Sequence, residues 1–247
     1  MKLNKLDSNI DDISAQFFGL TDEHIYYFDQ DQAQNTKQTT SSKALGIHHQ
    51  MLTDFQAMVA SAAKDGLDIK IASGFRSFER QLFIWNNKFS GITAIKNSDG
   101  EQVNIKTLSQ LEIVEAILFF SALPGASRHH WGCDIDIYAA NLLDGKSLQL
   151  EPWEYASSGP MAKLSSWLEN NANEYGFYFP YDSYRGGVAE EPWHLSYGPL
   201  AKQYQSVFNV DLLKNLLLQS DIGGKKVIVE NLTEISTRFI NNVNVTY

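Results

Sequence analysis

The sequence predicts a single domain of the α+β class, and three features support this prediction. The expected strands are short, their connections are long and uneven, and the regular spacing of alternating parallel strands and helices is missing. The length of 247 residues fits one large globular unit. Hydrophobic residues make up 43% and charged residues 20%, which is ordinary for a protein with a sizeable core.

Composition divides the domain 1–247 into three parts without a linker or a repeat. Residues 1–46 are polar and rich in turn-forming residues, which predicts a mostly irregular leader with short elements. Residues 48–200 form the expected core. In residues 201–247, a C-terminal extension, helical and strand patterns alternate.

Three elements are expected in the first half of the core. Apolar residues recur at helical spacing over residues 48–67, which predicts a helix. Residues 68–73 alternate as a strand does, and a second helix begins at Ser77. A capping-box pattern at residues 107–110 predicts a third helix that ends before Pro124.

The second half of the core contains three expected strands and one helix. A break at Gly132 precedes a strand at 133–138, and a long loop then leads to a helix over residues 160–176. Short strands are expected at 177–179 and 193–197.

Charge and composition exclude several classes of partner. The formal net charge of −9 gives no long-range attraction to nucleic acid or anionic lipid. The longest apolar stretch, residues 113–123, contains a glutamate and is too short for a membrane span of about 20 residues. The single cysteine, Cys133, allows no intrachain disulfide and is expected to be a half-buried strand residue rather than a nucleophile.

The N-terminal residues 1–18 lack the uninterrupted apolar core that a secretory signal needs. We therefore expect a cytoplasmic protein, whereas a longer native N-terminus would place it in the periplasm. No feature of the sequence predicts an oligomeric state.

Histidines and carboxylates around Gly132 predict a metal site. Glycine at this position permits a tight turn that carries His129 back beside a strand residue such as Asp136. Asp134 and Asp136 share one face of the strand without a cation close by in the sequence, so a metal or an arginine partner is expected. On chemistry alone, His130 is as good a ligand as His129.

Glu191 and His194 strengthen this prediction. Catalytic zinc usually takes three protein ligands and leaves a fourth position open. A histidine three residues after a carboxylate can be the third ligand, with the carboxylate as a base. The alternative is a solvated sheet face beside a polar loop histidine, and spacing does not decide between them.

Three motifs follow one another between about residues 48 and 200. They are Ser73-Gly74-Phe75-Arg76-Ser77 with Gln81 downstream, Ser127-x-His129-x-x-Gly132-x-x-x-Asp136, and Glu191-x-Trp193-His194. Together they resemble the zinc D-alanyl-D-alanine carboxypeptidases and dipeptidases of bacteria, the VanY-type D,D-carboxypeptidase group.

The resemblance implies a small antiparallel sheet that carries the zinc site and is flanked by helices. It also implies one Zn²⁺ ion bound by His129, Asp136 and His194, with Glu191 as the general base. The implied reaction is removal of D-alanine from peptides derived from peptidoglycan.

Further residues acquire roles through the same resemblance. Arg76 would stabilise the developing oxyanion or hold the substrate carboxylate with paired donors. Ser127 and Gln81 would donate hydrogen bonds to that carboxylate, and Ser77 and Trp193 would be additional substrate contacts. The simpler alternatives are a helix N-cap for Ser77, a surface position for Gln81 and a core position for Trp193.

Two other functions compete with carboxypeptidase activity. One is an endopeptidase or dipeptidase acting on cell-wall peptides. The other is a non-catalytic zinc module, as in hedgehog-type relatives of this fold, which would need neither Glu191 nor Arg76.

Overall fold

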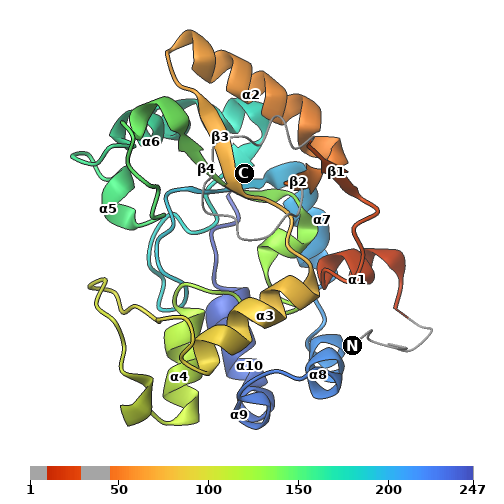
Figure 1. Ribbon diagram of the computed structural model, residues 1–247. Coiled ribbons are helices and arrows are strands. Elements are labelled where there is room, and N and C mark those ends of the chain that lie inside the picture. The colour runs from red at the N-terminus through yellow and green to blue at the C-terminus, as the bar shows by residue number, and fades with distance from the viewer. Residues whose placement is uncertain (1–9, 29–44, 247) are drawn as a thin grey trace.

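The computed structural model describes residues 10–28 and 45–246 and has the predicted α+β class. Figure 1 shows two parts: a sheet with α2, α5 and α6 around it, and a helical part made by α3, α4, α8, α9 and α10. Within the described residues, none of the helices has the length and apolar character needed to cross a membrane.

A four-stranded antiparallel sheet forms the first part. Its strands, in spatial order, are β3 (Ile69–Ser73), β4 (Asp134–Ala139), β6 (His194–Tyr197) and β5 (Phe177–Tyr178). Every residue of β4 is buried, because the strand lies in the interior of the sheet. The register places Asp136 opposite Ser73 on one neighbour and His194 on the other.

Four helices pack around this sheet. They are α2 (Leu52–Lys64), α5 (Pro152–Tyr155), α6 (Ala162–Asn171) and α7 (Gly198–Ser206). In α2 the buried residues Phe55, Met58 and Ala62 recur three and four positions apart, so one stripe faces the core as the sequence predicted. A 3-10 turn at His49–Met51 precedes it.

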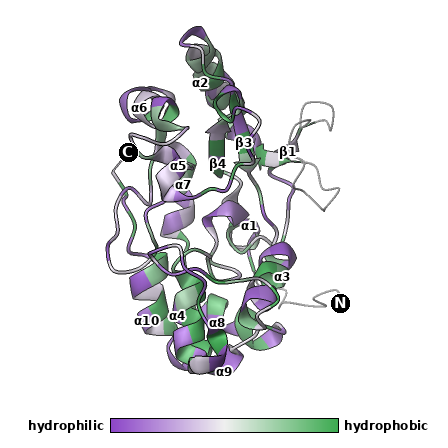
Figure 2. Ribbon diagram, turned by 60° about the vertical axis from the view of Figure 1, so that its left-hand side comes forward, coloured by the Kyte–Doolittle hydropathy of each residue, from purple (hydrophilic) through white to green (hydrophobic). Residues whose placement is uncertain are grey.

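The second part is mainly helical. It consists of α3 (Phe78–Phe89), α4 (Gln110–Leu118), α8 (Val210–Gln219), α9 (Lys225–Glu230), α10 (Leu232–Ile235) and a π-helical turn at Ser236–Ile240. Trp85 of α3 donates to the carbonyl of Gly223 at 2.9 Å, which ties α3 to the α8–α9 connection. Figure 2 shows hydrophobic residues gathered on α4, α8 and α10.

The alternation of strand and helix signals predicted for 201–247 is wrong for the described residues 201–246, which contain helices and no strand. The segment Lys225–Glu230 includes Val227 and Val229, whose β-branched side chains favour strands in isolation. It folds as α9 because Ile228 between them is buried in the core and α9 packs on α4.

The described part of the leader is more ordered than expected. It contains α1 (Asp12–Phe17) and β1 (Ile25–Tyr27), and β1 pairs with β2 (Gly46–His48) in a small second sheet that the sequence did not predict. Phe17 and Phe18 are buried in the core. The rest of the expected leader, residues 1–9 and 29–44, lies outside the described residues.

Two local predictions need correction. The capping box lies at Ser109 and Glu112 rather than at 107–110, because Glu112 reaches back to the Ser109 amide at 2.7 Å. Glu154 similarly accepts from the amides of Gln149 and Glu151, which fixes the short helix α5 within the expected loop.

Candidate active site

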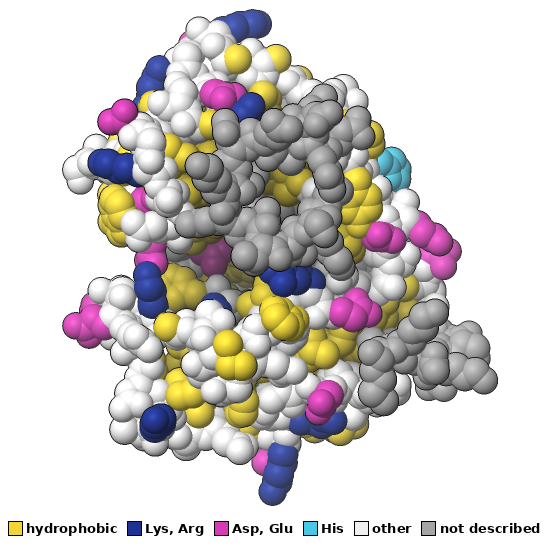
Figure 3. Space-filling model, viewed as in Figure 1, with side chains coloured by type: hydrophobic (Ala, Val, Ile, Leu, Met, Phe, Trp, Pro, Cys, Tyr) yellow, Lys and Arg dark blue, Asp and Glu magenta, His cyan; other side chains and the backbone are white. Residues whose placement is uncertain are grey.

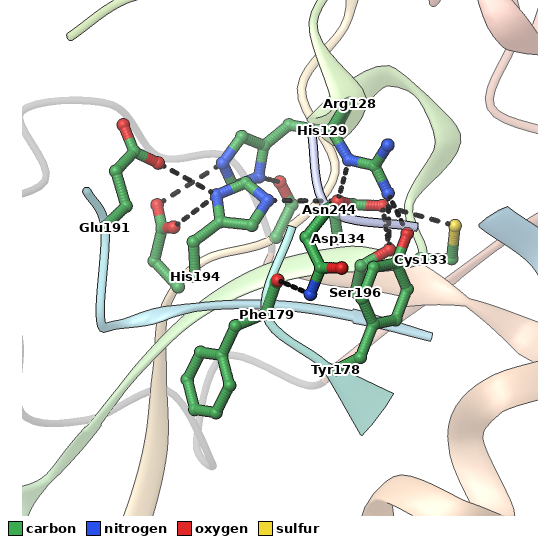
Figure 4. A network of polar contacts seen from close by, with 12 residues as sticks. Arg128, His129, Cys133, Asp134, Tyr178, Phe179, Glu191, His194, Ser196 and Asn244 are labelled. Atoms are coloured by element: carbon green, nitrogen blue, oxygen red, sulfur yellow. Dashed lines mark hydrogen bonds and ion pairs between the residues drawn. The ribbon is translucent and has the colours of Figure 1, made fainter. Parts of the chain in front are cut away.

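Three side chains from separate segments meet beside β4. His129, Asp136 and His194 each offer one ligand atom, and these atoms all lie within 4.8 Å of one another. Asp136 Oδ2 is 3.4 Å from His129 Nε2, and Asp136 Oδ1 is 3.2 Å from His194 Nδ1. All three residues are buried, and Figure 4 shows both imidazole rings turned toward the same point.

The backbone explains why these residues meet. Asp136 and His194 are paired directly across β4 and β6. His129 lies in a 3-10 turn, Arg128–Trp131, which Gly132 ends with a φ of 69°. A side chain at Gly132 would be strained at this φ and would collide with Ile25 and the His48 backbone, so the turn requires glycine.

Hydrogen bonds fix which nitrogen of each histidine faces the cluster. His129 Nδ1 lies 3.0 Å from the carbonyl of Gly74, which can only accept, so Nδ1 carries the proton and Nε2 faces Asp136. His194 Nε2 lies 3.0 Å from Asp134 Oδ1, so Nδ1 is the nitrogen that faces Asp136. Each ring can therefore turn a lone pair toward a metal ion bound in the cluster, as metal-ligating histidines do.

The donor set fits a cation. Within the described part of the chain, His194 Nδ1 and Asp136 Oδ1 are buried and make no hydrogen bond, a costly arrangement unless a further group lies between them. Burial alone would raise the pKa of Asp136, but His129 and His194 hold it well below its usual range. Two imidazoles and one carboxylate are a common ligand set for catalytic zinc.

A second buried carboxylate, that of Asp134, contacts His194 on the side away from Asp136. Asp134 accepts from Arg128 Nε at 2.6 Å and from the Ser196 hydroxyl at 3.0 Å. Although burial acts to raise the pKa of Asp134, Arg128 and His194 lower it to about 2. The expectation that no cation lies close by in the sequence was wrong, since Arg128 is six residues away and reaches Asp134 around the Gly132 turn.

Arg128 is itself held by groups that are distant in sequence. Its Nη2 donates to the Tyr178 hydroxyl at 2.9 Å and to Ser196 Oγ at 2.7 Å, and its guanidinium lies 4.4 Å from the ring centroid of Trp131. Figure 4 shows Arg128, Tyr178 and Ser196 together on the side of Asp134 that faces away from Glu191. Asp134 thus orients His194 through a neutralised, fully buried pair.

His130 is not available as a ligand. Its Nε2 accepts from the Gly125 amide at 3.0 Å and its Nδ1 lies 2.5 Å from the Arg76 carbonyl, so both ring nitrogens are occupied. Burial lowers the pKa of His130 to about 3 and keeps the ring neutral. Of the two adjacent histidines, the structure brings His129 to the cluster.

Cys133 is completely buried rather than half-buried. Its sulfur lies 3.5 Å from Asp134 Oδ2, and burial raises the pKa of the thiol well above its ordinary value. A thiol in this environment stays protonated and is a poor nucleophile.

Glu191 stands next to the cluster. Its Oε2 is 3.2 Å from His194 Nδ1, and its carbonyl accepts from the His194 amide in the turn that leads into β6. Tyr181, which the sequence analysis did not identify, packs its ring edge against His194 with centroids 5.0 Å apart. The Glu191 amide donates to the Tyr181 carbonyl at 3.0 Å, so the two residues are positioned together.

A cavity of about 530 Å³ opens over the cluster, between the two parts of the molecule. Figure 3 shows the surface hollowed there, with acidic and basic side chains around the hollow. Seven predicted site residues line the cavity: Arg76, Ser127, His129, Asp136, Glu191, Trp193 and His194.

The two remaining predicted residues lie behind the cavity wall. Ser77 caps α3, accepting from the Arg80 amide at 3.3 Å. Gln81 is fully buried rather than on the surface, accepts from Arg76 at 2.9 Å and donates to the Ala122 carbonyl at 2.6 Å. With Ser73, which accepts from the other Arg76 nitrogen at 2.9 Å, it fixes the guanidinium.

Two predicted substrate contacts face the cavity directly. The Ser127 hydroxyl is buried and has no hydrogen-bond partner among the described residues, so it is available to a ligand. Trp193 packs against Tyr155, with ring centroids 5.6 Å apart, and contributes an apolar surface.

A wall of the cavity comes from the C-terminal extension, which the sequence analysis did not connect with the site. It is formed by Phe239, Ile240, Asn241, Val243 and Val245. Asn244 anchors this segment. Its backbone N–H donates to the Pro180 carbonyl at 2.9 Å, and its side-chain amide donates to the Phe179 carbonyl at 3.0 Å (Figure 4).

Comparison with known proteins gives a consistent result. Residues 44–200 match the family model described as VanY, D-alanyl-D-alanine carboxypeptidase. An uncharacterized protein of Haemophilus influenzae is 37% identical over 121 residues, which cover 48% of this chain and 92% of that protein.

Two longer relatives carry functional names. The putative carboxypeptidase YodJ of Bacillus subtilis and a D-alanyl-D-alanine carboxypeptidase of Enterococcus faecalis are each 28% identical over 145 residues, 58% of this chain. This chain spans only 42% and 44% of their respective lengths.

Among solved structures, the D,D-pentapeptidase VanY of the VanB-type vancomycin-resistance cassette, in complex with Zn(II), aligns with a TM-score of 0.46 and 24% identity over 67% of this chain and 82% of that chain. The LD-carboxypeptidase LdcB aligns with a TM-score of 0.48 and 22% identity over 87% and 78%. Likenesses of this degree add nothing to the assignment, which rests on the sequence match.

The match of residues 44–200 spans more than half of the chain and includes the four-stranded sheet and every predicted site residue. It confirms the resemblance that the three motifs indicated. The chain belongs to the VanY family of D-alanyl-D-alanine carboxypeptidases.

Proposed function

We propose that this protein is a zinc-dependent D,D-carboxypeptidase that removes the C-terminal D-alanine from peptidoglycan stem peptides. The observation that carries the proposal is the cluster of His129, Asp136 and His194, with Glu191 beside it at the floor of a cavity. Family membership supports the substrate class.

The cluster is suited to one zinc ion, which when bound polarises the scissile carbonyl and lowers the pKa of water at its open position to about 7. Glu191 is the general base: its carboxylate, within reach of the cluster, accepts a proton from the attacking water and delivers it to the leaving amine. His129 and His194 keep their lone pairs directed at the ion through their bonds to Gly74 and Asp134.

Arg76 is the electrophilic partner in this mechanism. Its guanidinium lines the cavity and is held at fixed geometry by Gln81 and Ser73, both uncharged. A fixed cation stabilises negative charge that develops on the carbonyl oxygen without reorganisation during the reaction. Ser127 and Trp193 complete the proposed substrate contacts, and Gln81 and Ser77 act indirectly, by holding Arg76 and by capping α3.

The test is release of D-alanine from a stem pentapeptide by the purified protein. We expect release that stops with a chelator and returns with added zinc. A protein that binds zinc stoichiometrically and releases no D-alanine would contradict the proposal. Cleavage at an internal bond of the same peptide would identify an endopeptidase. If neither the terminal nor an internal bond is cleaved, the protein is a non-catalytic zinc module.

A further inference from the structure

Four lysine and arginine side chains line the cavity among the described residues, and they fall into two pairs. Lys96 and Arg128 each form an ion pair with a carboxylate. Arg76 and Lys88 form none within the part of the chain that the structure describes, and their hydrogen bonds go to uncharged groups. The cavity therefore contains two positive charges that have no ion-pair partner among the described residues and can pair with an anionic ligand.

Lys88 is held in place but not saturated. Its ammonium group, at the last turn of α3, donates to the Ser121 hydroxyl at 2.5 Å. An ammonium has three donors, so two remain for a ligand. Burial lowers the pKa of Lys88, with Arg76 acting in the same direction and Glu191 against it. A partly desolvated ammonium is stabilised when an anion joins it.

The two cations stand at different distances from the reacting atoms. Arg76 is fixed beside the proposed metal ligands, because its guanidinium donates to Ser73, which is paired with Asp136 across β3 and β4. Lys88 lies in the last turn of α3, the helix that follows Arg76, and its ammonium group donates to Ser121 beyond the end of α4. Lys88 therefore lies further from Asp136 than Arg76 does.

A peptide with a free C-terminus carries negative charge at two places in the same order. One charge develops on the oxygen of the scissile carbonyl during the reaction, and the other is permanent on the carboxylate of the leaving residue. The first belongs beside the metal cluster, where Arg76 is fixed. The second lies one residue further along the substrate.

We propose that Lys88 binds the C-terminal carboxylate of the substrate and makes the site select peptides with a free C-terminus, while Arg76 acts on the reacting carbonyl. This inference rests on the proposed carboxypeptidase function and assigns Lys88 as its specificity-determining residue. The competing explanation is that Lys88 only holds Ser121 and the end of α4.

The experiment compares an Nα-acylated D-Ala-D-Ala peptide with its C-terminal amide, using the zinc-loaded enzyme. Lys88→Met removes the charge at nearly constant length, and Lys88→Arg keeps it. For Lys88→Met we expect KM for the acid to rise about 10- to 100-fold, which corresponds to the loss of one charge-assisted hydrogen bond. The kcat should stay within about twofold of the wild-type value. KM for the amide should change by less than about twofold, and Lys88→Arg should retain most of the preference.

Lys96→Met is the matched control, since it removes a cavity lysine that already has a carboxylate partner. Its ratio of acid to amide KM should stay within about twofold of wild type. Equal losses on acid and amide in Lys88→Met, or an unchanged ratio, would overturn the proposal in favour of a structural role.

A binding measurement separates this proposal from the proposed function. In a zinc-loaded Glu191→Gln background, calorimetry should give tighter binding of the acid than of the amide, and Lys88→Met should remove the difference. If wild type cleaves neither peptide, the proposed function fails, and this binding difference still decides the role of Lys88. Binding of neither peptide would overturn both.

Discussion

Glu191 and His194 lie 3.2 Å apart, yet their substitution should have different effects because only one is a metal ligand in the proposed mechanism. Glu191→Gln should keep zinc and lose about 10²- to 10⁴-fold in kcat, the usual contribution of a general base. His194→Ala should lose both zinc and activity. Zinc content and D-alanine release measured on the same samples check this, and wild-type turnover in either variant would remove the mechanism.

Asp134 should matter for metal binding although it is not a ligand. Asp134→Asn weakens the acceptor that orients His194, and we expect zinc affinity to fall about 10- to 100-fold. It also leaves Arg128 buried without its counter-charge, which should cost about 3 to 5 kcal/mol of unfolding free energy.

Competition with a zinc-binding dye and urea unfolding test these two effects. Asp68→Asn is the control, because Asp68 forms an exposed pair with Lys70 on the neighbouring strand, and exposed pairs contribute about 0 to 1 kcal/mol. Asp134→Asn with wild-type affinity and stability would show that the buried pair has neither role.

At the residue scale, the motifs predicted which residues gather at the proposed metal site, including Glu191, whereas the residues that support them could not be predicted. Arg128 donates hydrogen bonds to Tyr178 and Ser196, which are 50 and 68 positions away in sequence. These contacts depend on how β4, β5 and β6 are paired in the sheet. Sequence spacing could place Asp134 and Asp136 on the same face of a strand, but it could not predict that Arg128 pairs with Asp134. Lys88 and Tyr181 belonged to no motif, and only the folded cavity identifies them.

At the scale of elements, the Gly132 turn controls the position of His129. Gly132→Ala should cost about 1 to 2 kcal/mol for the left-handed backbone alone, and more because the new methyl group meets Ile25 and the His48 backbone. Since relief of that collision moves the 3-10 turn, zinc affinity should fall as well.

Gly100→Ala provides the comparison, because Gly100 has a φ of 77° but open space around it. It should show the backbone cost and unchanged zinc binding. Thermal unfolding and zinc titration of both variants separate backbone strain from displacement of the ligand. Equal zinc affinity in Gly132→Ala and wild type would contradict this role for the turn.

Most elements of the core could be predicted because their signals are local. Strands β3, β4, β5 and β6 show the expected apolar patterns. Ser77 caps α3, in line with the preference of serine for the N-cap position. The second sheet could not be predicted, because β1 and β2 are only three residues long each. The all-helical C-terminal extension could not be predicted either, because α9 depends on its packing against α4. Tertiary contacts decide where local preference is weak.

At the scale of the whole molecule, stability should depend on pH through buried histidines that are not among the proposed metal ligands. His24 and His48 are buried with ring centroids 5.3 Å apart, and burial lowers their pKa values to about 4 and about 3. The unfolded chain takes up protons near pH 6.5 and the folded chain does not, so stability is full above that pH and falls as pH drops toward 4.

For His24 alone the loss between pH 7 and pH 5 should be about 2 kcal/mol. His24→Gln, measured by thermal unfolding at both pH values with zinc-free protein, should have a shallower dependence than wild type. A variant with the same slope as wild type would show that His24 is not the source.

The cavity wall at residues 239–245 has a consequence for how the protein is made. A ribosome adds His194, the last of the three proposed metal ligands, about fifty residues before it completes this wall. At about 5 to 20 residues per second, this interval is roughly 3 to 10 s. During biosynthesis the nascent chain thus contains all three proposed metal ligands before the wall of its cavity is complete, so under the proposed function metal binding can precede substrate binding.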